Sequence, residues 1–183
     1  MKTKMNAKDI LVPAVALFLI ALVATLLLAV VNNMTANKIA EQNAATEAAA
    51  RQSVMADAAD FKAVDDYYEA LDEDGDVIGY VFNETGDSKG YGGAVSVTVG
   101  VDKDGVITGI VPGDLSNETP GLGQNASKES FKSQFIGKSE SVAVDKDGGE
   151  IQALTSATIT SRAVTSGVQL ALDHYAEVTG GAK

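Results

Sequence analysis

Val95-Ser96-Val97-Thr98-Val99-Gly100-Val101 is the run that decides the fold, because valines alternate along it with small or polar residues. An alternation of period two predicts a half-buried β-strand whose valines face a core. A turn sequence at 102–105 follows, and a second run rich in β-branched residues occupies 106–111. Together the two runs predict an antiparallel hairpin.

Further strands are predicted on the N-terminal side of this hairpin, where strand signals begin near Phe61. The apolar run 77–82 predicts one strand, and residues 64–71 are expected to be its hairpin partner. An Asp-x-Asp-Gly formula occurs at 72–75, 102–105 and 145–148. We interpret all three as turns. A calcium site is the alternative, although the late bidentate Glu of a calcium-binding loop is absent.

Helical patterns are predicted on the C-terminal side. Residues 127–136 predict a short helix with Phe131 and Phe135 on one face, and we expect these rings in the core rather than stacked on a ligand. A short strand is expected at 142–144. An amphipathic pattern from Ala163 to Tyr175 predicts a C-terminal helix that ends near the glycines at 180 and 181. The fold class is therefore α+β, with a mainly antiparallel twisted sheet packed by helices.

The composition excludes several kinds of function. The 183 residues carry a net charge of −11, which disfavours nucleic-acid binding. No cysteine is present, so iron–sulfur clusters, thiolate metal sites and disulfides are excluded. Any redox role must come from an organic cofactor. The single histidine, His174, lies on the last turns of the C-terminal helix, where we expect packing or solvation rather than catalysis.

An uncharged apolar run at 10–31 predicts a single transmembrane helix. Lys2, Lys4 and Lys8 precede it, so residues 1–9 are expected to form a cytoplasmic tail of a cell-membrane protein. Residues 32–60 are expected to form a helical stalk, or alternatively a partly disordered tether, and residues 61–183 a domain on the outer face. A cleaved signal peptide is the alternative for the apolar run, which is longer than the usual signal core.

The stretch 154–162 predicts a site for an anion. Five hydroxyl side chains fall within it, directly before the C-terminal helical pattern: Thr155, Ser156, Thr158, Thr160 and Ser161. Free N–H groups and the positive end of the helix dipole favour a phosphate at such a helix start. A Ser/Thr-rich cap without a ligand is the alternative. Arg162 is a candidate partner for the phosphate.

Two loops add candidate ligand-binding segments. The connection at 86–93 is rich in glycine, and it either exposes backbone to a ligand or is only flexible. In the loop Glu118-Thr119-Pro120-Gly121-Leu122-Gly123, Pro followed by Gly predicts a tight turn. Such a turn can place bare N–H groups against a planar ring.

The segment Thr155-Ser156-Ala157-Thr158-Ile159-Thr160-Ser161 resembles the flavinylation signature of the FMN-binding subunits of the Rnf and Na+-pumping NADH:quinone oxidoreductase complexes. The resemblance implies that Thr158 is esterified to the phosphate of FMN. Ser156 stands where the family usually has Gly, and Gln152 where the recognition Asp of the modifying transferase is often found. The resemblance also extends to the Glu-Thr-Pro-Gly-Leu-Gly loop. The implied cofactor-binding residues are Thr158, Thr155, Ser156, Ala157, Glu118, Thr119, Gly121, Leu122 and Gly123.

The same resemblance implies a function. In chain length the protein is closer to the G subunit of the Rnf complex than to the C subunit of the quinone-reducing complex. It would be a covalent FMN electron carrier within an ion-translocating ferredoxin:NAD+ oxidoreductase, with no catalytic or metal-binding residue of its own and the coupling ion left open. The implied partners are the other membrane subunits, an FMN transferase and membrane lipid. Two alternatives remain: a flavin module of another extracytoplasmic reductase chain, and a non-catalytic anchored binding domain.

Overall fold

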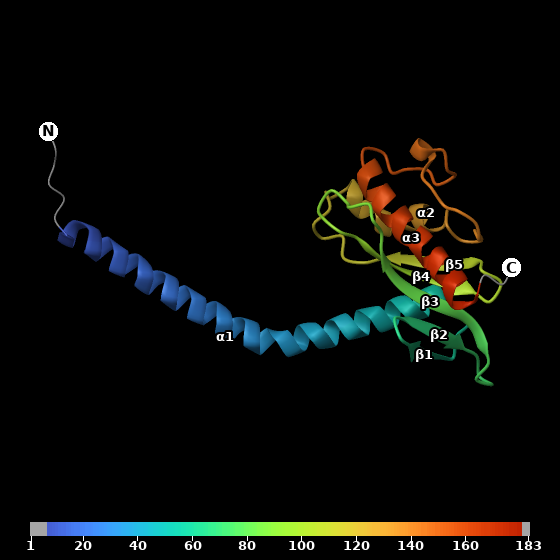
Figure 1. Cartoon of the computed structure of the whole chain (residues 1–183), viewed down its shortest axis with the longest axis horizontal. Coiled ribbons are helices and arrows are strands. Elements are labelled where there is room, and N and C mark those ends of the chain that lie inside the picture. The colour runs from blue at the N-terminus through green and yellow to red at the C-terminus, as the bar shows by residue number, and fades with distance from the viewer. Residues whose placement is uncertain (1–6, 181–183) are drawn as a thin grey trace. The chain divides into compact units, whose positions relative to one another are not determined.

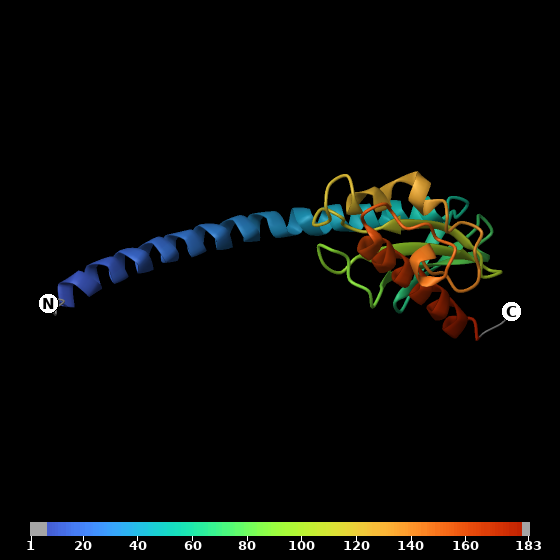
Figure 2. The same cartoon turned by 90° about the horizontal axis from the view of Figure 1, so that it is seen from above.

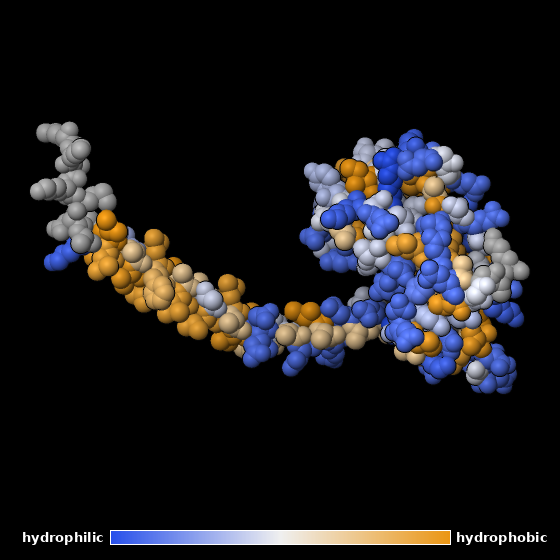
Figure 3. Space-filling view, in the orientation of Figure 1, coloured by the Kyte–Doolittle hydropathy of each residue, from blue (hydrophilic) through white to orange (hydrophobic). Residues whose placement is uncertain are grey.

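The computed structural model describes residues 7–180 and divides the chain into two units, 1–47 and 48–183. The first unit is the larger part of one continuous helix, α1, Ala7–Val54. Its apolar side chains are exposed, and its apolar part is long enough to cross a membrane (Figure 3). The expected stalk is thus helical as far as Val54. The tail residues 1–6 lie outside the described residues.

The second unit contains an antiparallel sheet of five strands in the order β1-β2-β3-β4-β5 (Figure 1). The strands are β1 Asp60–Val64, β2 Tyr67–Leu71, β3 Val77–Thr85, β4 Ser96–Asp102 and β5 Ile107–Pro112. The predicted hairpin is confirmed as β4 and β5, which place Val99 opposite Ile110. The hairpin partner predicted at 64–71 is confirmed as β2, which pairs with β3 from Tyr67 to Leu71, whereas Val64 belongs to β1. A turn at Asp65 divides this segment, since Asp is one of the residues that tolerate its positive φ of 46°.

The first two Asp-x-Asp-Gly sequences form the predicted turns. The first carboxylates of the first two, on Asp72 and Asp102, each accept hydrogen bonds from the backbone N–H groups two and four residues later. The glycines Gly75 and Gly105 take positive φ angles of 85° and 83°. The third sequence forms the short 3-10 helix η2, Asp145–Asp147. In the first two sequences, the first carboxylate therefore stabilises the turn itself.

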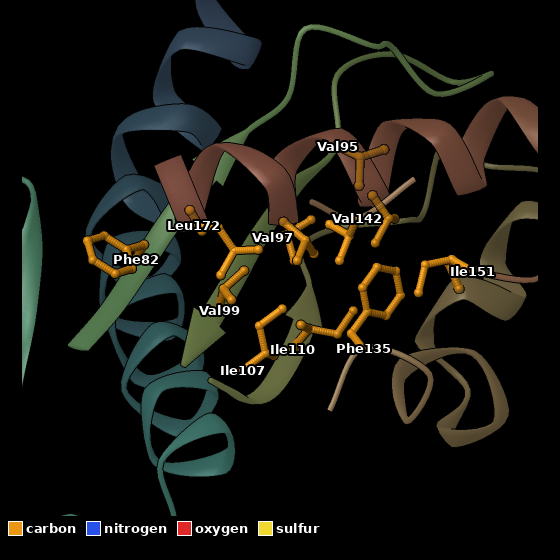
Figure 4. Close-up of a cluster of buried hydrophobic side chains, with 14 of the residues drawn as sticks. Phe82, Val95, Val97, Val99, Ile107, Ile110, Phe135, Val142, Ile151 and Leu172 are labelled. Carbon is orange, nitrogen blue, oxygen red and sulfur yellow. The ribbon is translucent and has the colours of Figure 1, made fainter. Parts of the chain in front are cut away.

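Two helical segments cover opposite faces of the sheet within the second unit (Figure 2). Helix α3, Thr158–Val178, covers one face and packs its apolar side chains on the valines of β4 (Figure 4). The opposite face receives the last turn of α1, where Val54 and Met55 are buried. Alternation along the strands explains this arrangement, because valines of β4 face α3 while Gly100 lies against the backbone of Val54.

The domain core therefore begins before residue 61. Val54, Met55 and Ala58 pack on the sheet, so the end of the expected 32–60 stalk belongs to the domain. The hydroxyl of Thr108 donates to the carbonyl oxygen of Val54 at 2.5 Å and satisfies one of the helix's terminal acceptors. The helix end is fixed to the sheet by packing and by this hydrogen bond.

The segments between β5 and α3 contain less regular structure than expected. The 3-10 helix η1, Gly123–Ser127, and the short helix α2, Glu129–Lys132, replace the single helix predicted at 127–136, because Lys128 is extended and interrupts it. Phe131 and Phe135 are buried with ring centroids 5.5 Å apart, which confirms their place in the core. The strand expected at 142–144 is only an isolated bridge from Val144, since the η2 turn follows at once.

Candidate functional site

A cavity of about 510 Å³ lies at the N-terminal end of α3. Three chain segments line it: the β3–β4 connection, the loop after β5, and the start of α3. The lining residues are Tyr91, Glu118, Thr119, Leu122, Gly123, Ser156, Ala157, Thr158, Ile159 and Thr160. Seven of the nine candidate residues thus lie together, although they come from two separate segments of the sequence. Thr155 and Gly121 are exposed and do not line the cavity.

The start of α3 is an uncapped helix N-terminus at this cavity. Thr158 is the first residue of the helix, and Ala157 occupies the capping position without a side-chain hydrogen bond. The first helix amide with an acceptor is that of Ser161, which donates to the carbonyl of Ala157 at 3.0 Å. Within residues 7–180, no carbonyl accepts from the amides of Thr158, Ile159 and Thr160. These three N–H groups and the helix dipole are available to an anion.

The hydroxyl side chains of this segment divide into two groups. Ser161 is buried and bridges Leu154 and Ala157, accepting from the N–H of the first and donating to the carbonyl of the second. Thr160 is also buried and donates to Glu118. Ser156 and Thr158 also line the cavity, Ser156 exposed and Thr158 half-buried. The two buried hydroxyls hold the local structure, and Thr158 is the more accessible threonine at the start of α3.

Ser156 adopts a left-handed backbone conformation with φ of 60°. This conformation is comfortable for Gly and strained for most other residues, because the Cβ atom approaches the backbone. The position is the one at which the flavinylation signature usually has Gly. The turn that leads into Thr158 therefore has a backbone conformation that favours Gly, the usual residue of the signature. Ser156 adopts this conformation at some cost in stability.

Glu118 is a buried carboxylate in the wall of the cavity, with only 3% of its surface exposed. Its Oε1 accepts from the N–H of Gly92 at 2.8 Å, and its Oε2 accepts from the hydroxyl of Thr160. Both oxygens are thus occupied by groups of the protein. The cost of burying this charge is offset by hydrogen bonds to it.

Apolar side chains surround the opening of the cavity. Tyr91 is 75% exposed, Ile159 50% and Leu122 38%. A mainly apolar lining with a few polar groups is typical of a site for a small molecule or cofactor. Tyr91, Ile159 and Thr160 were not among the candidate residues; the glycine-rich connection indicated only the neighbourhood of Tyr91.

Arg162 does not line the cavity and is already paired with a carboxylate, which argues against the predicted pairing with a phosphate. Its guanidinium binds both carboxylate oxygens of Asp147, at 2.7 and 2.6 Å. This ion pair lowers the pKa of Asp147 and raises that of Arg162. Gln152 also lies outside the cavity, and its backbone N–H donates to the side chain of Gln134.

His174 has the packing role expected for it. Its Nδ1 lies 2.8 Å from Glu84, and its ring packs on Phe82 with centroids 4.8 Å apart. It joins the last turns of α3 to β3 and does not line the cavity.

Comparison with known proteins agrees with this geometry. Residues 90–173 match the FMN-binding domain family, and residues 1–54 match the RnfG N-terminal region. Over 200 aligned positions the chain is 42% identical to the G subunit of the Na+-translocating ferredoxin:NAD+ oxidoreductase complex of Acetobacterium woodii, with 95% of each chain covered. The chain belongs to the RnfG family. The part that matches the FMN-binding domain contains all three segments that line the cavity.

Other RnfG-family and related proteins are similar over shorter stretches. The G subunit of the proton-translocating ferredoxin:NAD+ oxidoreductase complex of Clostridium ljungdahlii is 48% identical over 103 residues, which is 52% of this chain and 53% of that one. A crystal structure of the C subunit of the Na+-translocating NADH-quinone reductase from Parabacteroides distasonis aligns at 29% identity. That alignment covers 63% of this chain and 60% of the other, with a TM-score of 0.45.

Proposed function

We propose that this RnfG-family chain carries FMN as a phosphoester of Thr158 and relays electrons within an ion-translocating ferredoxin:NAD+ oxidoreductase complex. One observation carries the proposal: Thr158 is the first residue of α3 and lines the cavity beside three helix amides without acceptors. A bond between Oγ1 of Thr158 and phosphorus would form as the hydroxyl O–H bond of Thr158 and one P–O bond of the FMN phosphate break, with the net loss of one water. The negative charge left on the phosphate would be stabilised by the helix N-terminus.

The cavity suits the rest of the cofactor as well. Tyr91, Leu122 and Ile159 provide apolar surface for the isoalloxazine ring. FMN supplies one- and two-electron transfer, and the protein has to hold and tune it. A covalent link has a physical reason on the outer face of a membrane, because a dissociated flavin would not return to a cytoplasmic pool.

The titratable groups of the cavity favour electron relay over substrate turnover. The lining contains one carboxylate and one phenol, those of Glu118 and Tyr91. Both oxygens of Glu118 already accept hydrogen bonds from the protein. General acid–base chemistry on a diffusible substrate needs a group free to exchange protons, whereas electron transfer does not.

Helix α1 supports a single-pass membrane anchor. The apolar run 10–31 contains no charged residue, and Lys2, Lys4 and Lys8 precede it. This charge bias favours a cytoplasmic N-terminus in the cell membrane and a flavin domain on the outer face. The uncharged helix offers no path for an ion, so the coupling Na+ or H+ would cross elsewhere in the complex. The partners would be the other membrane subunits, membrane lipid and the FMN transferase that modifies Thr158.

Intact mass spectrometry of the full-length protein purified from native membranes would test the attachment. We expect an added mass of one FMN less one water, together with in-gel flavin fluorescence after denaturation. Thr158→Ala should abolish both signals. Ser130→Ala is the matched control, since this exposed hydroxyl lies outside both the flavinylation signature and the cavity. An unmodified mass in the native protein would favour the binding-domain alternative instead.

A further inference from the structure

Glu118 joins the three segments that form the cavity. It belongs to the loop after β5, and its carboxylate binds the N–H of Gly92 in the β3–β4 connection and the hydroxyl of Thr160 in the first turn of α3. We infer that Glu118 is a positioning residue, which fixes the attachment turn against the apolar rim and places a buried negative charge beside the flavin. The resemblance marks Glu118 only as a residue that lines the cofactor.

The surrounding backbone leaves space for this carboxylate. A Cβ atom at Gly123 would lie 2.5 Å from Oε2 of Glu118 and 2.7 Å from Oγ1 of Thr160. A Cβ atom at Gly90 would overlap with Oε1. Neither Gly90 nor Gly123 has a positive φ, so their backbone conformation does not require glycine. The close approach of the Glu118 carboxylate explains why neither position carries a side chain.

The two hydrogen bonds connect the reactive position to the rim. Thr160 lies two residues after Thr158 in the same helical turn, and Gly92 directly follows Tyr91. A displacement of Glu118 would therefore free the attachment turn and the Tyr91 segment together. Hydrogen bonds to a charged acceptor are stronger than neutral ones, so one carboxylate can order both segments.

The charge of Glu118 should also affect the electron affinity of the flavin. A buried carboxylate is screened weakly, and it opposes the addition of negative charge to a nearby group. It should therefore lower the reduction potential of FMN in this cavity. The charge effect rests on the proposed function, because it requires FMN at Thr158. The positioning role does not, and it can be measured in flavin-free protein.

Two substitutions separate the charge from the hydrogen bonds. Glu118→Gln keeps the shape of the side chain: its amide oxygen can accept from Gly92, and its amide nitrogen can donate to Thr160. Glu118→Ala removes both contacts and leaves buried polar groups unpaired. Glu140→Gln is the control, since this exposed carboxylate lies outside the cavity.

Hydrogen exchange of the Gly92 amide tests whether Glu118 orders the Tyr91 segment. The measurement uses full-length protein that carries Thr158→Ala and therefore no covalent flavin. We expect about tenfold faster exchange with Glu118→Ala, as for the loss of one charge-assisted hydrogen bond. Glu118→Gln should restore most of the protection. Unchanged exchange in the alanine variant would overturn the positioning role, whether or not FMN is attached in the native protein.

Spectroelectrochemical titration of the flavinylated protein tests whether the charge of Glu118 lowers the reduction potential of the flavin. We expect the flavinylated fraction of Glu118→Gln to have a more positive reduction potential than both the unsubstituted protein and Glu140→Gln. A potential equal to theirs would overturn the charge effect. If the unsubstituted protein carried no covalent FMN, the proposed function and the charge effect would both fail, while the exchange measurement would still decide the positioning role.

Discussion

Replacing Ser156 with Gly should stabilise the domain. The residue has φ of 60°, in the left-handed region, which costs an L-residue about 1 to 2 kcal/mol. Gly avoids this cost, but its greater freedom in the unfolded chain reduces stability by about 0.4 to 1 kcal/mol. The net gain therefore lies between about 0 and 1.6 kcal/mol, and we expect a value near the middle of that range, about 0.8 kcal/mol. For a domain of this size that corresponds to a rise of roughly 2 to 4 °C in Tm.

Thermal unfolding in detergent, followed by near-ultraviolet circular dichroism, measures this gain. All five tyrosines lie in residues 67–175, so the signal reports the domain rather than the apolar helix. A Thr158→Ala background removes differences in flavin content. Thr155→Gly is the control. Within residues 7–180 only Asp65 and Ser156 are non-glycine residues with positive φ, so this change should lower stability by about 0.5 to 1 kcal/mol. A Tm for Ser156→Gly at or below that of the parent would refute the strain at this turn.

Three other substitutions test the packing and charge of the domain. Gly100→Ala should destabilise the domain by about 1 to 3 kcal/mol, because the new Cβ atom would lie 2.5 Å from the carbonyl oxygen of Val54. Urea unfolding measures this loss, and an unchanged urea midpoint would contradict the contact. Phe135→Ala should cost about 3 to 5 kcal/mol in the same assay, and a loss below about 1 kcal/mol would argue against its full burial. The Arg162 ion pair lowers the pKa of Asp147 below its unfolded value, so its stabilisation is present at neutral pH and lost as pH falls through the folded pKa. Asp147→Asn should therefore lower Tm at about pH 6, and this difference should shrink only as the pH falls below about 4; a difference that stays constant down to about pH 2 would exclude the ion pair as the cause.

The sheet was predictable where a strand buries one face. Alternating valines at 95–101 determine which side of β4 meets the core, and the glycine turn at 105 brings β5 back beside it. The segments after β5 were less predictable. Residues 142–144 have strand composition, but the turn that follows them leaves no room for a ladder. The strand propensity of residues 142–144 was therefore overridden by the path of the chain toward α3.

For the candidate site, the sequence indicated which residue types are present, but not which of them lie close together in space. Hydroxyl residues before a helical pattern predicted the helix N-terminus, yet they did not show which of these residues are buried and which line the cavity. Arg162 followed the same motif, and only the fold placed Asp147 within 2.7 Å of it. An ion pair between residues far apart in the chain cannot be read from spacing.

The sequence by itself determined the apolar helix, the α+β class, the β4–β5 hairpin and the threonine motif, because each depends on residues that are neighbours along the chain. Only the tertiary structure decided that the end of α1 packs under the sheet and that Tyr91, Glu118 and Thr158 share one cavity. These contacts join segments far apart in the chain, as the bond between Glu118 and Gly92 does across 26 positions. Their formation depends on how the sheet and α3 pack, which no local pattern encodes.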